Sequence, residues 1–300
     1  MAAPSLRVIP HRTVKTRRIG FSYPSGGLDR HFVQGDLVMS GHRSHGHYLA
    51  KGGDLNALAA EIFTRSTGCS RGRGGSMHLT SPDVGVLGTS ALVGGGMGTG
   101  VGSALASVRR GLDRVTAIFF GDGAIEEGVF HEAMNFAALY KLPVIFVCEN
   151  NLYASHMPLA IRQPRDQLAE HARPYGVPGT RIDGNDVMVV LDTARRAVER
   201  ARAGLGPSFL EAMTYRWRGH VGPGWDREFN IRPEEEISEW LTRDPIPRFG
   251  TSLIAGGTAT SRDLEAIEAE VEAEVAESIE FARKSEFPNV EELLDFVYSS

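Results

Sequence analysis

The sequence has little cysteine and no long apolar run. Its 300 residues include two cysteines, Cys69 and Cys148, and neither sits in a spacing typical of zinc sites. Cys148 lies in the apolar run VIFVCEN, which predicts a buried, unreactive thiol. The few cysteines and the lack of a secretory apolar segment favour a reducing compartment, so we expect a cytoplasmic protein. No apolar run approaches the roughly 20 residues that cross a bilayer, so we expect no membrane partner.

The sequence also lacks a strong excess of charge of either sign. The formal net charge is -5 and the pI is near 6.1. Such a balance argues against nucleic acid or an anionic membrane surface as the main partner. With 42% hydrophobic and 23% charged residues, the composition suits one large α/β domain or two small ones, and either could bury a substantial core.

Glycine, in contrast, is abundant. The chain has 35 glycines, and they concentrate between residues 68 and 128, which indicates backbone that closely approaches another group. Within that region, the stretch 68–90 (GCSRGRGGSMHLTSPDVGVLGTS) predicts a long loop with a function. The reason is that structureless loops of this length are uncommon inside compact domains.

Hydrophobic periodicity predicts alternating helices and strands. Amphipathic or small-residue patterns predict helices over 53–67, 94–110, 126–140, 186–203 and 262–285. Continuous apolar runs predict buried strands over 114–120, 143–149 and 208–214. This alternation predicts an α/β fold with a doubly wound, mainly parallel sheet and helices on both faces. The acidic outer face of the last helix predicts a solvated surface that carries no chemistry.

One strand–helix–strand unit, 114–151, gathers candidate ligands at one edge of this sheet. Such a crossover is right-handed and makes its strands parallel, so their carboxyl ends lie at the same edge. Asp122 follows the first strand and Asn151 follows the second. Their oxygens suit Mg²⁺ or Ca²⁺, and Gly121 and Gly123 let backbone N–H groups approach an anion next to a helix N-terminus. The unit therefore predicts a site for a metal and a diphosphate.

The spacing within this unit separates the possible diphosphate cofactors. GDGAIE lacks the third glycine of the dinucleotide-binding pattern, and the chain has no GK[ST] phosphate loop. Gly-Asp-Gly alone and Asn-Asn alone are common turn and loop sequences, and each is usually structural. Together, GDG, then 26 residues (124–149), then NN looks like the thiamine diphosphate signature.

The surrounding sequence resembles the alpha subunit of the thiamine diphosphate-dependent decarboxylating component of 2-oxo acid dehydrogenases, of the pyruvate, acetoin and branched-chain types. The resemblance covers about 36–300 and includes HRSHGHYLAKGG, GCSRGRGGSMHL, SALVGG, RIDGND, YRWRGHVGPG and RPEEEISEWLTRDPI. It implies a thiamin diphosphate-binding fold over 36–300 with a C-terminal helical extension, after a divergent N-terminal segment, 1–35. That segment lacks the family's histidine-containing stretch ending in GQEA, and Val221 stands where kinase-regulated members have serine.

The resemblance also implies which residues hold the cofactor. Asp122, the Asn151 side chain and the Tyr153 carbonyl would bind Mg²⁺. The diphosphate would be bound by backbone groups of Gly121, Gly123 and Ala124 and by the guanidinium of Arg43. The aminopyrimidine would contact the backbone stretch that includes Ala91 and Val93.

Histidines complete the expected site. The resemblance implies that His220 reaches the diphosphate and the reacting centre, where it can stabilise negative charge or move a proton. His42, His45 and His47 lie close together in the sequence, and a metal cluster is conceivable there. The interpretation we favour is an active-site loop around Arg43, with His45 as its functional member.

The resemblance finally implies partners. No glutamate suited to activating the cofactor stands out in the chain, and in the family a beta subunit supplies it, so we expect an α2β2 heterotetramer. We expect an oxidoreductase subunit that decarboxylates a small 2-oxo acid, or cleaves acetoin, and passes the acyl group to a lipoyl-bearing acyltransferase. Two alternatives are a thiamine-dependent carboligase or transketolase-like subunit, and a catalytically degenerate assembly partner. Neighbouring genes for a beta subunit and a lipoyl protein would favour the first interpretation.

Overall fold

The computed structural model describes residues 35–222, 224–225, 228, 231–292 and 294–295. All but the last residue of the expected N-terminal segment, 1–35, lie outside these ranges. The boundary between that segment and a domain over 36–300 therefore stays a prediction.

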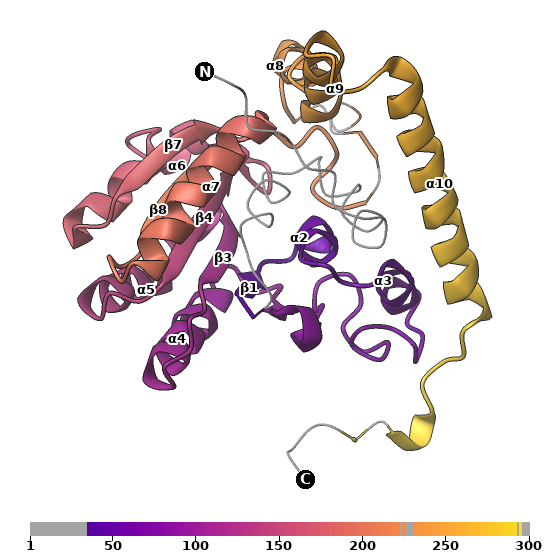
Figure 1. Cartoon of the computed structure of the whole chain (residues 1–300), viewed down its shortest axis with the longest axis horizontal. Helices are drawn as coiled ribbons and strands as arrows, with labels where there is room; N and C mark the ends of the chain where they lie inside the picture. The colour runs from indigo at the N-terminus through magenta and orange to yellow at the C-terminus, as the bar shows by residue number, and fades with distance from the viewer. Residues whose placement is uncertain (1–34, 223, 226–227, 229–230, 293, 296–300) are drawn as a thin grey trace.

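A parallel sheet forms the centre of the fold (Figure 1). Within the described residues it has six strands in the order β2-β1-β3-β4-β8-β7, and every neighbouring pair is parallel. Its strands are β1 (Leu37–Ser40), β2 (Val86–Thr89), β3 (Thr116–Gly121), β4 (Val144–Asn150), β7 (Gly179–Asp183) and β8 (Ser208–Met213). A separate antiparallel hairpin consists of β5 (Tyr153–Ala154) and β6 (Met157–Pro158). The expected α/β class with a parallel sheet is confirmed.

Helices connect these strands and extend beyond them. The α-helices are α2 (His45–Ala50), α3 (Leu55–Ile62), α4 (Gly96–Arg109), α5 (Gly128–Leu139), α6 (Leu159–Arg162), α7 (Val187–Arg202), α8 (Glu234–Leu241), α9 (Pro245–Ala255) and α10 (Ser261–Lys284). Shorter 3-10 segments are η3 (Pro82–Val84), η4 (Asp122–Glu126), η5 (Leu168–Tyr175) and η7 (Val290–Glu292). In the part of the chain that the structure describes, no helix combines the length and apolar character needed to cross a membrane.

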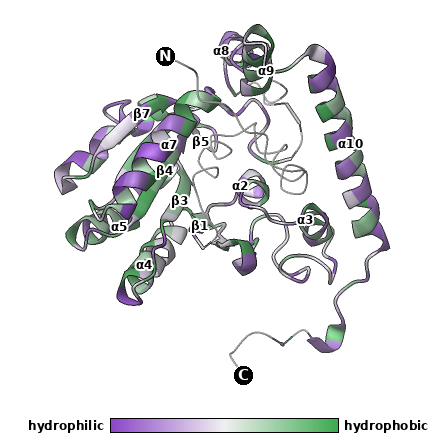
Figure 2. Ribbon diagram, viewed as in Figure 1, coloured by the Kyte–Doolittle hydropathy of each residue, from purple (hydrophilic) through white to green (hydrophobic). Residues whose placement is uncertain are grey.

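Helices cover both faces of the sheet, and its strands are largely hydrophobic (Figure 2). Phe120 and Phe146 belong to a buried core with α4 and α5. Their chain neighbours Phe119 and Val147 belong to a second core with α7. Successive side chains of a strand point to opposite faces, so a strand buried on both sides is apolar throughout. The two cores thus confirm the doubly wound arrangement.

Short elements differ from the expectations. The last third of the loop expected over 68–90 contains η3 and β2, and β1 and β7 were not expected at all. These strands have only four or five residues, too few to show a pattern. In addition, the helix N-terminus expected next to Gly121 and Gly123 is that of η4, which has Gly121 as its N-cap and precedes α5. The other expected helices and strands form.

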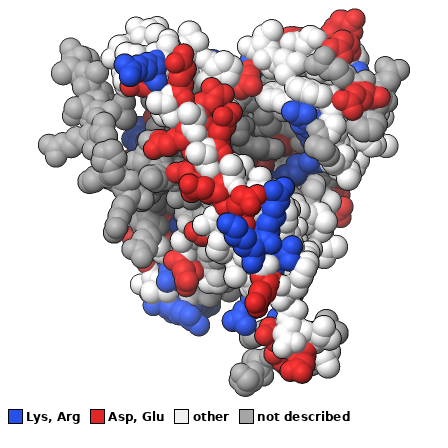
Figure 3. All heavy atoms as spheres, turned by 90° about the vertical axis from the view of Figure 1, so that its right-hand side faces the viewer, with Lys and Arg blue, Asp and Glu red and all other residues white. Residues whose placement is uncertain are grey.

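The last helix lies at the edge of the molecule. Ala282, near the C-terminal end of α10, packs against Ala59 and Ala60 of α3. Most of the remaining α10 side chains are exposed, and acidic groups follow the helix along this side of the molecule (Figure 3). The expected solvated acidic face is confirmed.

A buried carboxylate organises the loop that follows α3. Glu61 is fully buried, and each of its oxygens accepts two backbone hydrogen bonds. Oε2 accepts from Ser70 and Gly72 at 2.7 and 2.9 Å, and Oε1 accepts from Gly74 and Gly75 at 2.7 and 3.0 Å. These four donors replace the water that an ionised carboxylate loses on burial, so Glu61 fixes the loop's course.

Replacing Glu61 by glutamine should destabilise the protein. In Glu61→Gln an amide NH₂ group faces two backbone N–H groups, which lose their acceptor. We expect the free energy of unfolding to fall by at least about 2 kcal/mol, measured by urea denaturation. The control Glu268→Gln, on the exposed face of α10, should stay within about 0.5 kcal/mol of the parent protein. Equal unfolding midpoints for both variants would contradict this role of Glu61.

Candidate functional site

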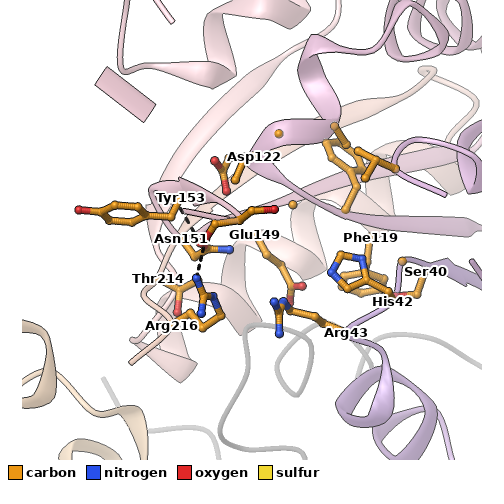
Figure 4. A pocket seen from close by; sticks show the side chains of 18 of the residues that line it. Ser40, His42, Arg43, Phe119, Asp122, Glu149, Asn151, Tyr153, Thr214 and Arg216 are labelled. Carbon is orange, nitrogen blue, oxygen red and sulfur yellow. Dashed lines mark hydrogen bonds between the residues drawn. The ribbon is translucent and has the colours of Figure 1, made fainter. Parts of the chain in front are cut away.

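A cavity of about 610 Å³ opens at the carboxyl edge of the sheet (Figure 4). Its walls come from the segments that follow β1, β3, β4 and β8. The chain runs outward from β1 to β2 and then returns to β3 on the other side of β1. Open α/β sheets bind ligands at such a switch point, and ligand pockets usually measure roughly 300–1,000 Å³. Both the position and the size of this cavity therefore suit a cofactor.

The three residues expected to hold a metal line this cavity together. Gly121, the last residue of β3, pairs with Glu149 of β4, so the segments after the two strands emerge at the same height. Asp122 follows the first strand and is 1% exposed, while Asn151 and Tyr153 follow the second. A carboxylate, an amide oxygen and a nearby backbone carbonyl form the kind of hard oxygen set that Mg²⁺ prefers.

The first asparagine of the Asn-Asn pair has a different place. Asn150 Nδ2 donates to Glu211 Oε1 at 2.8 Å, and Asn150 Oδ1 accepts from the Leu152 N–H at 3.1 Å. Asn150 is fully buried and anchors the turn after β4. Of the pair, Asn151 is the one that reaches the cavity.

Two glycines shape the backbone on either side of Asp122. A Cβ at Gly121 would meet nothing within 4 Å, so the space beside that backbone is open. A Cβ at Gly123 would lie 2.9 Å from the Ala154 Cβ, so a larger residue would not fit between η4 and β5. Bare backbone beside an oxygen ligand set fits a metal-bound diphosphate, because such a ligand needs close approach to the chain.

Arg162, which the sequence did not single out, contacts Asp122. Its side chain is 5% exposed, and it donates from Nη2 to Asp122 Oδ2 and from Nη1 to Glu126 Oε1. Burial raises the pKa of Asp122 above its ordinary value, and the positive charge of Arg162 opposes that rise. Forty residues separate the two partners, so no local pattern could have joined them.

Basic and imidazole groups meet at the mouth of the cavity. Arg43 Nη2 donates to His220 Nδ1 at 3.0 Å and to the His220 carbonyl oxygen at 2.9 Å. Because a guanidinium cannot accept a hydrogen bond, Nδ1 must be the unprotonated nitrogen, and the proton of the neutral ring lies on Nε2. Nε2 faces Ser155 Oγ at 3.4 Å. Burial and the charge of Arg43 lower the pKa of His220, in agreement with a neutral ring.

The turn between β5 and β6 is held against this mouth. Ser155 has a φ of 53°, a left-handed conformation that L-residues rarely adopt. Its carbonyl oxygen accepts from Arg216 Nη2 at 2.9 Å, and the His156 ring centroid lies 5.8 Å from that of His220. The hairpin thereby places a hydroxyl and a second imidazole beside His220.

Comparison with known proteins assigns the chain to a family. The model of the dehydrogenase E1 component matches residues 25–291. The chain belongs to the dehydrogenase E1 component family. It is 40% identical to the alpha subunit of acetoin:2,6-dichlorophenolindophenol oxidoreductase from Bacillus subtilis, over 91% of this chain and 81% of that protein. The resemblance inferred from the sequence motifs is thus confirmed.

Two further relatives represent the pyruvate and the acetoin groups, one each. The chain is 40% identical to the alpha subunit of the pyruvate dehydrogenase E1 component from Porphyra purpurea, over 88% of this chain and 78% of that protein. It is 36% identical to the acetoin:2,6-dichlorophenolindophenol oxidoreductase alpha subunit from Cupriavidus necator, over 91% of this chain and 82% of that protein. These identities are too close to one another to separate a pyruvate-type from an acetoin-type chain.

Most of the other residues expected to contact the cofactor line the cavity. The ones that line it are Arg43, Val93, Gly121, Gly123, Ala124 and His220. Ala91 and His45 are not among the lining residues. His45 Nε2 instead lies 2.9 Å from Ser76 Oγ and so ties α2 to the glycine-rich loop. The expected roles of both residues stay predictions. No three His, Cys, Asp or Glu side chains of the described residues are grouped to hold a metal ion.

His47 occupies a position that the sequence did not indicate. It is 2% exposed, with Nδ1 2.7 Å from Ser40 Oγ and Nε2 3.1 Å from Glu149 Oε1. Its ring stacks on Phe119 with 4.1 Å between centroids. His47 therefore holds the Glu149 carboxylate in the cavity wall. The partners are 102 residues apart, so only the folded chain brings them together.

Removing the charge of Arg43 should raise the pKa of His220. In Arg43→Met the ring loses both a nearby positive charge and the donor to Nδ1, so protonation becomes easier. The measurement is the pH dependence of the histidine ring proton shifts by NMR, with the signal assigned from a His220→Gln spectrum. The control Arg109→Met, at the exposed end of α4, should leave that signal unchanged. A His220 pKa that does not move in Arg43→Met would contradict this electrostatic coupling.

The same coupling has a consequence for stability. The pKa of His220 in the folded protein lies below the ordinary value of about 6.5, so the unfolded chain takes up the proton first as pH falls. The contribution of neutral His220 to the free energy of unfolding is therefore complete at neutral pH and is lost as pH falls below about 6.5. We expect this loss in the free energy of unfolding to be smaller in Arg43→Met than in the parent protein.

Proposed function

We propose that the chain is the alpha subunit of a thiamine diphosphate- and Mg²⁺-dependent 2-oxo acid dehydrogenase, which decarboxylates a small 2-oxo acid or cleaves acetoin. The observation that carries this proposal is the convergence of Asp122, Asn151 and Tyr153 on one cavity, from the ends of two adjacent parallel strands. Membership of the dehydrogenase E1 component family and the names of the relatives support the same activity.

The cofactor site divides into a metal part and a diphosphate part. Asp122, the Asn151 side chain and the Tyr153 carbonyl hold Mg²⁺, which in turn neutralises phosphate oxygens. Gly123 and Ala124 bind the diphosphate through backbone N–H groups. The open space beside the backbone before Asp122 supports this assignment, because a phosphate needs room there.

The mouth of the cavity supplies the remaining contacts. Arg43 and Arg216 concentrate positive charge there, which suits both a diphosphate and the carboxylate of a 2-oxo acid. The backbone at Val93 contacts the aminopyrimidine. When bound, thiamine diphosphate supplies the electron sink for cleaving a carbon–carbon bond next to a carbonyl group. His220, with its proton on Nε2, donates to the substrate oxygen that gains negative charge, or moves a proton at that atom.

One wall of the cavity exposes apolar side chains in the part of the chain that the structure describes. Leu92 and Val93 line it, yet they are 74% and 52% exposed. Apolar side chains exposed in the wall of a cavity favour cover by another chain. This supports an α2β2 heterotetramer, in which a beta subunit closes the site and supplies the carboxylate that activates the cofactor. A lipoyl-bearing acyltransferase then accepts the acyl group.

Co-expression with a beta subunit of the same family tests this function. Reduction of ferricyanide is measured with a panel of 2-oxo acids and acetoin, with and without Mg²⁺ and thiamine diphosphate. We expect reduction to require both subunits, the metal, the cofactor and one class of substrate. Stoichiometric cofactor binding without any turnover would identify a degenerate assembly partner instead. Carbon–carbon bond formation without ferricyanide reduction would identify a carboligase.

Removing the charge of Asp122 should abolish metal-dependent cofactor binding. Asp122→Asn keeps the shape of the side chain but removes the only charged group among the proposed metal ligands. We expect calorimetry on the assembled complex to show at least about a 100-fold loss of thiamine diphosphate affinity at fixed Mg²⁺, since even outer-shell changes cost 10–100-fold at metal sites. The control Asp166→Asn, whose side chain is 77% exposed and pairs with Arg181, should bind normally. Unchanged affinity in Asp122→Asn would overturn the proposed site.

A further inference from the structure

Arg162 is a buried arginine that none of the proposed cofactor contacts explains. Its side chain is 5% exposed, and its guanidinium nitrogens contact three different groups. Nη2 donates to Asp122 Oδ2, Nη1 donates to Glu126 Oε1, and Nε donates to the Met157 carbonyl oxygen at 3.2 Å. A planar guanidinium satisfied on three sides has one fixed position, which a more flexible cation could not reproduce.

These contacts join the two segments that carry the proposed metal ligands. Asp122 and Glu126 are the first and last residues of η4, directly after β3. Met157 belongs to the β5–β6 hairpin, which begins at Tyr153, and α6 follows the hairpin and ends at Arg162. The arginine therefore cross-links the segment after β3 to the segment after β4, on which Tyr153 lies.

We propose that Arg162 is a positioning residue for the metal, which holds Asp122 from outside the cavity and fixes η4 against the β5–β6 hairpin. This proposal rests on the proposed function, because it concerns the same metal. Asp122 lines the cavity whereas Arg162 does not, so the arginine occupies one carboxylate oxygen from beyond the wall. Outer groups of this kind orient the direct ligands of a metal and often determine its affinity.

The charge of Arg162 also allows two carboxylates to stand close together. Asp122 is 1% exposed and the Glu126 side chain is 34% exposed, and both contact the same guanidinium. Without the positive charge between them, the two carboxylates would repel each other and move apart. Glu126 is held further by Gln163, whose Nε2 donates to Glu126 Oε1 at 3.2 Å. A metal would thus meet a carboxylate that is already fixed in place.

The opposite arrangement would be competition, in which Mg²⁺ must displace Arg162 from Asp122. The two arrangements predict opposite effects of removing Arg162 on metal binding. If Arg162 positions Asp122, removing it weakens metal binding, because the carboxylate loses its fixed orientation. If Arg162 competes, removing it strengthens metal binding, because the carboxylate becomes free.

Calorimetry on the complex with the beta subunit distinguishes them. Thiamine diphosphate is titrated at a series of Mg²⁺ concentrations into the parent protein and into Arg162→Met. We expect the Mg²⁺ concentration needed for half-maximal affinity to rise about 10–100-fold in the variant. The control Arg173→Met removes the same charge from a side chain that is 85% exposed, and it should bind as the parent does. Unchanged or tighter Mg²⁺ dependence in Arg162→Met would overturn the proposal.

A second variant covers the case in which Arg162→Met does not fold. Arg162→Lys keeps the positive charge but cannot reproduce all three fixed contacts, because an ammonium group lacks the planar fork. We expect a smaller rise in the required Mg²⁺ concentration and a normal melting temperature without metal, and a parent-like Mg²⁺ dependence would overturn the proposal. Failure of the parent complex to bind thiamine diphosphate at any Mg²⁺ concentration would instead count against the proposed function.

Discussion

The in-register parallel pairing of β3 with β4 determines where the site can form. Gly121 pairs with Glu149, so the two strands end level and the residues that follow them emerge side by side. A slip of one residue would turn every side chain of a strand to the opposite face. Close packing on both faces opposes such a slip, because Phe120 and Phe146 fill one core while Phe119 fills the other. The position of the proposed metal ligands is thus a consequence of core packing.

The buried carboxylates of this fold show how a group that only stabilises the structure differs from one that can bind a ligand. Glu61 accepts four backbone hydrogen bonds, and Glu211 accepts from the Asn150 side chain and from a backbone N–H. Asp36 accepts from a backbone N–H and pairs with an arginine. These three groups lie away from the cavity, and their partners satisfy them. Asp122 also has an arginine partner, but it lies in the cavity wall, where a ligand can reach it. The exposure of a satisfied carboxylate to a cavity, and not burial alone, marks the site.

Prediction from the sequence depended on the length of each apolar run and on how far apart two contacting residues lie in the chain. The strands β3 and β4 were predictable because their runs of four and five consecutive apolar residues need burial on both faces. Asp122 and Asn151 were predictable with them, since a right-handed crossover places both strand ends at one edge. In contrast, β1 has four residues, and its place beside β3 depends on long-range packing. The contacts of Arg162 and of His47 span 40 and 102 residues, and only the folded backbone creates them.

The cavity wall combines groups that the chain itself holds in place with exposed apolar groups, and in the proposed heterotetramer this couples cofactor binding to assembly. In one part of the wall, His47 holds the Glu149 carboxylate and Arg162 holds Asp122. These groups therefore need little rearrangement when a ligand binds. In another part of the wall, Leu92 and Val93 are exposed, and in the proposed heterotetramer another chain covers them. In the proposed heterotetramer the cofactor therefore contacts both subunits. A ligand that binds the assembled form more tightly than the separate chain stabilises the assembly by mass action, and assembly raises its affinity by the same factor. In the proposed assembly, one part of the wall is thus arranged in advance by this chain, and the other depends on the partner.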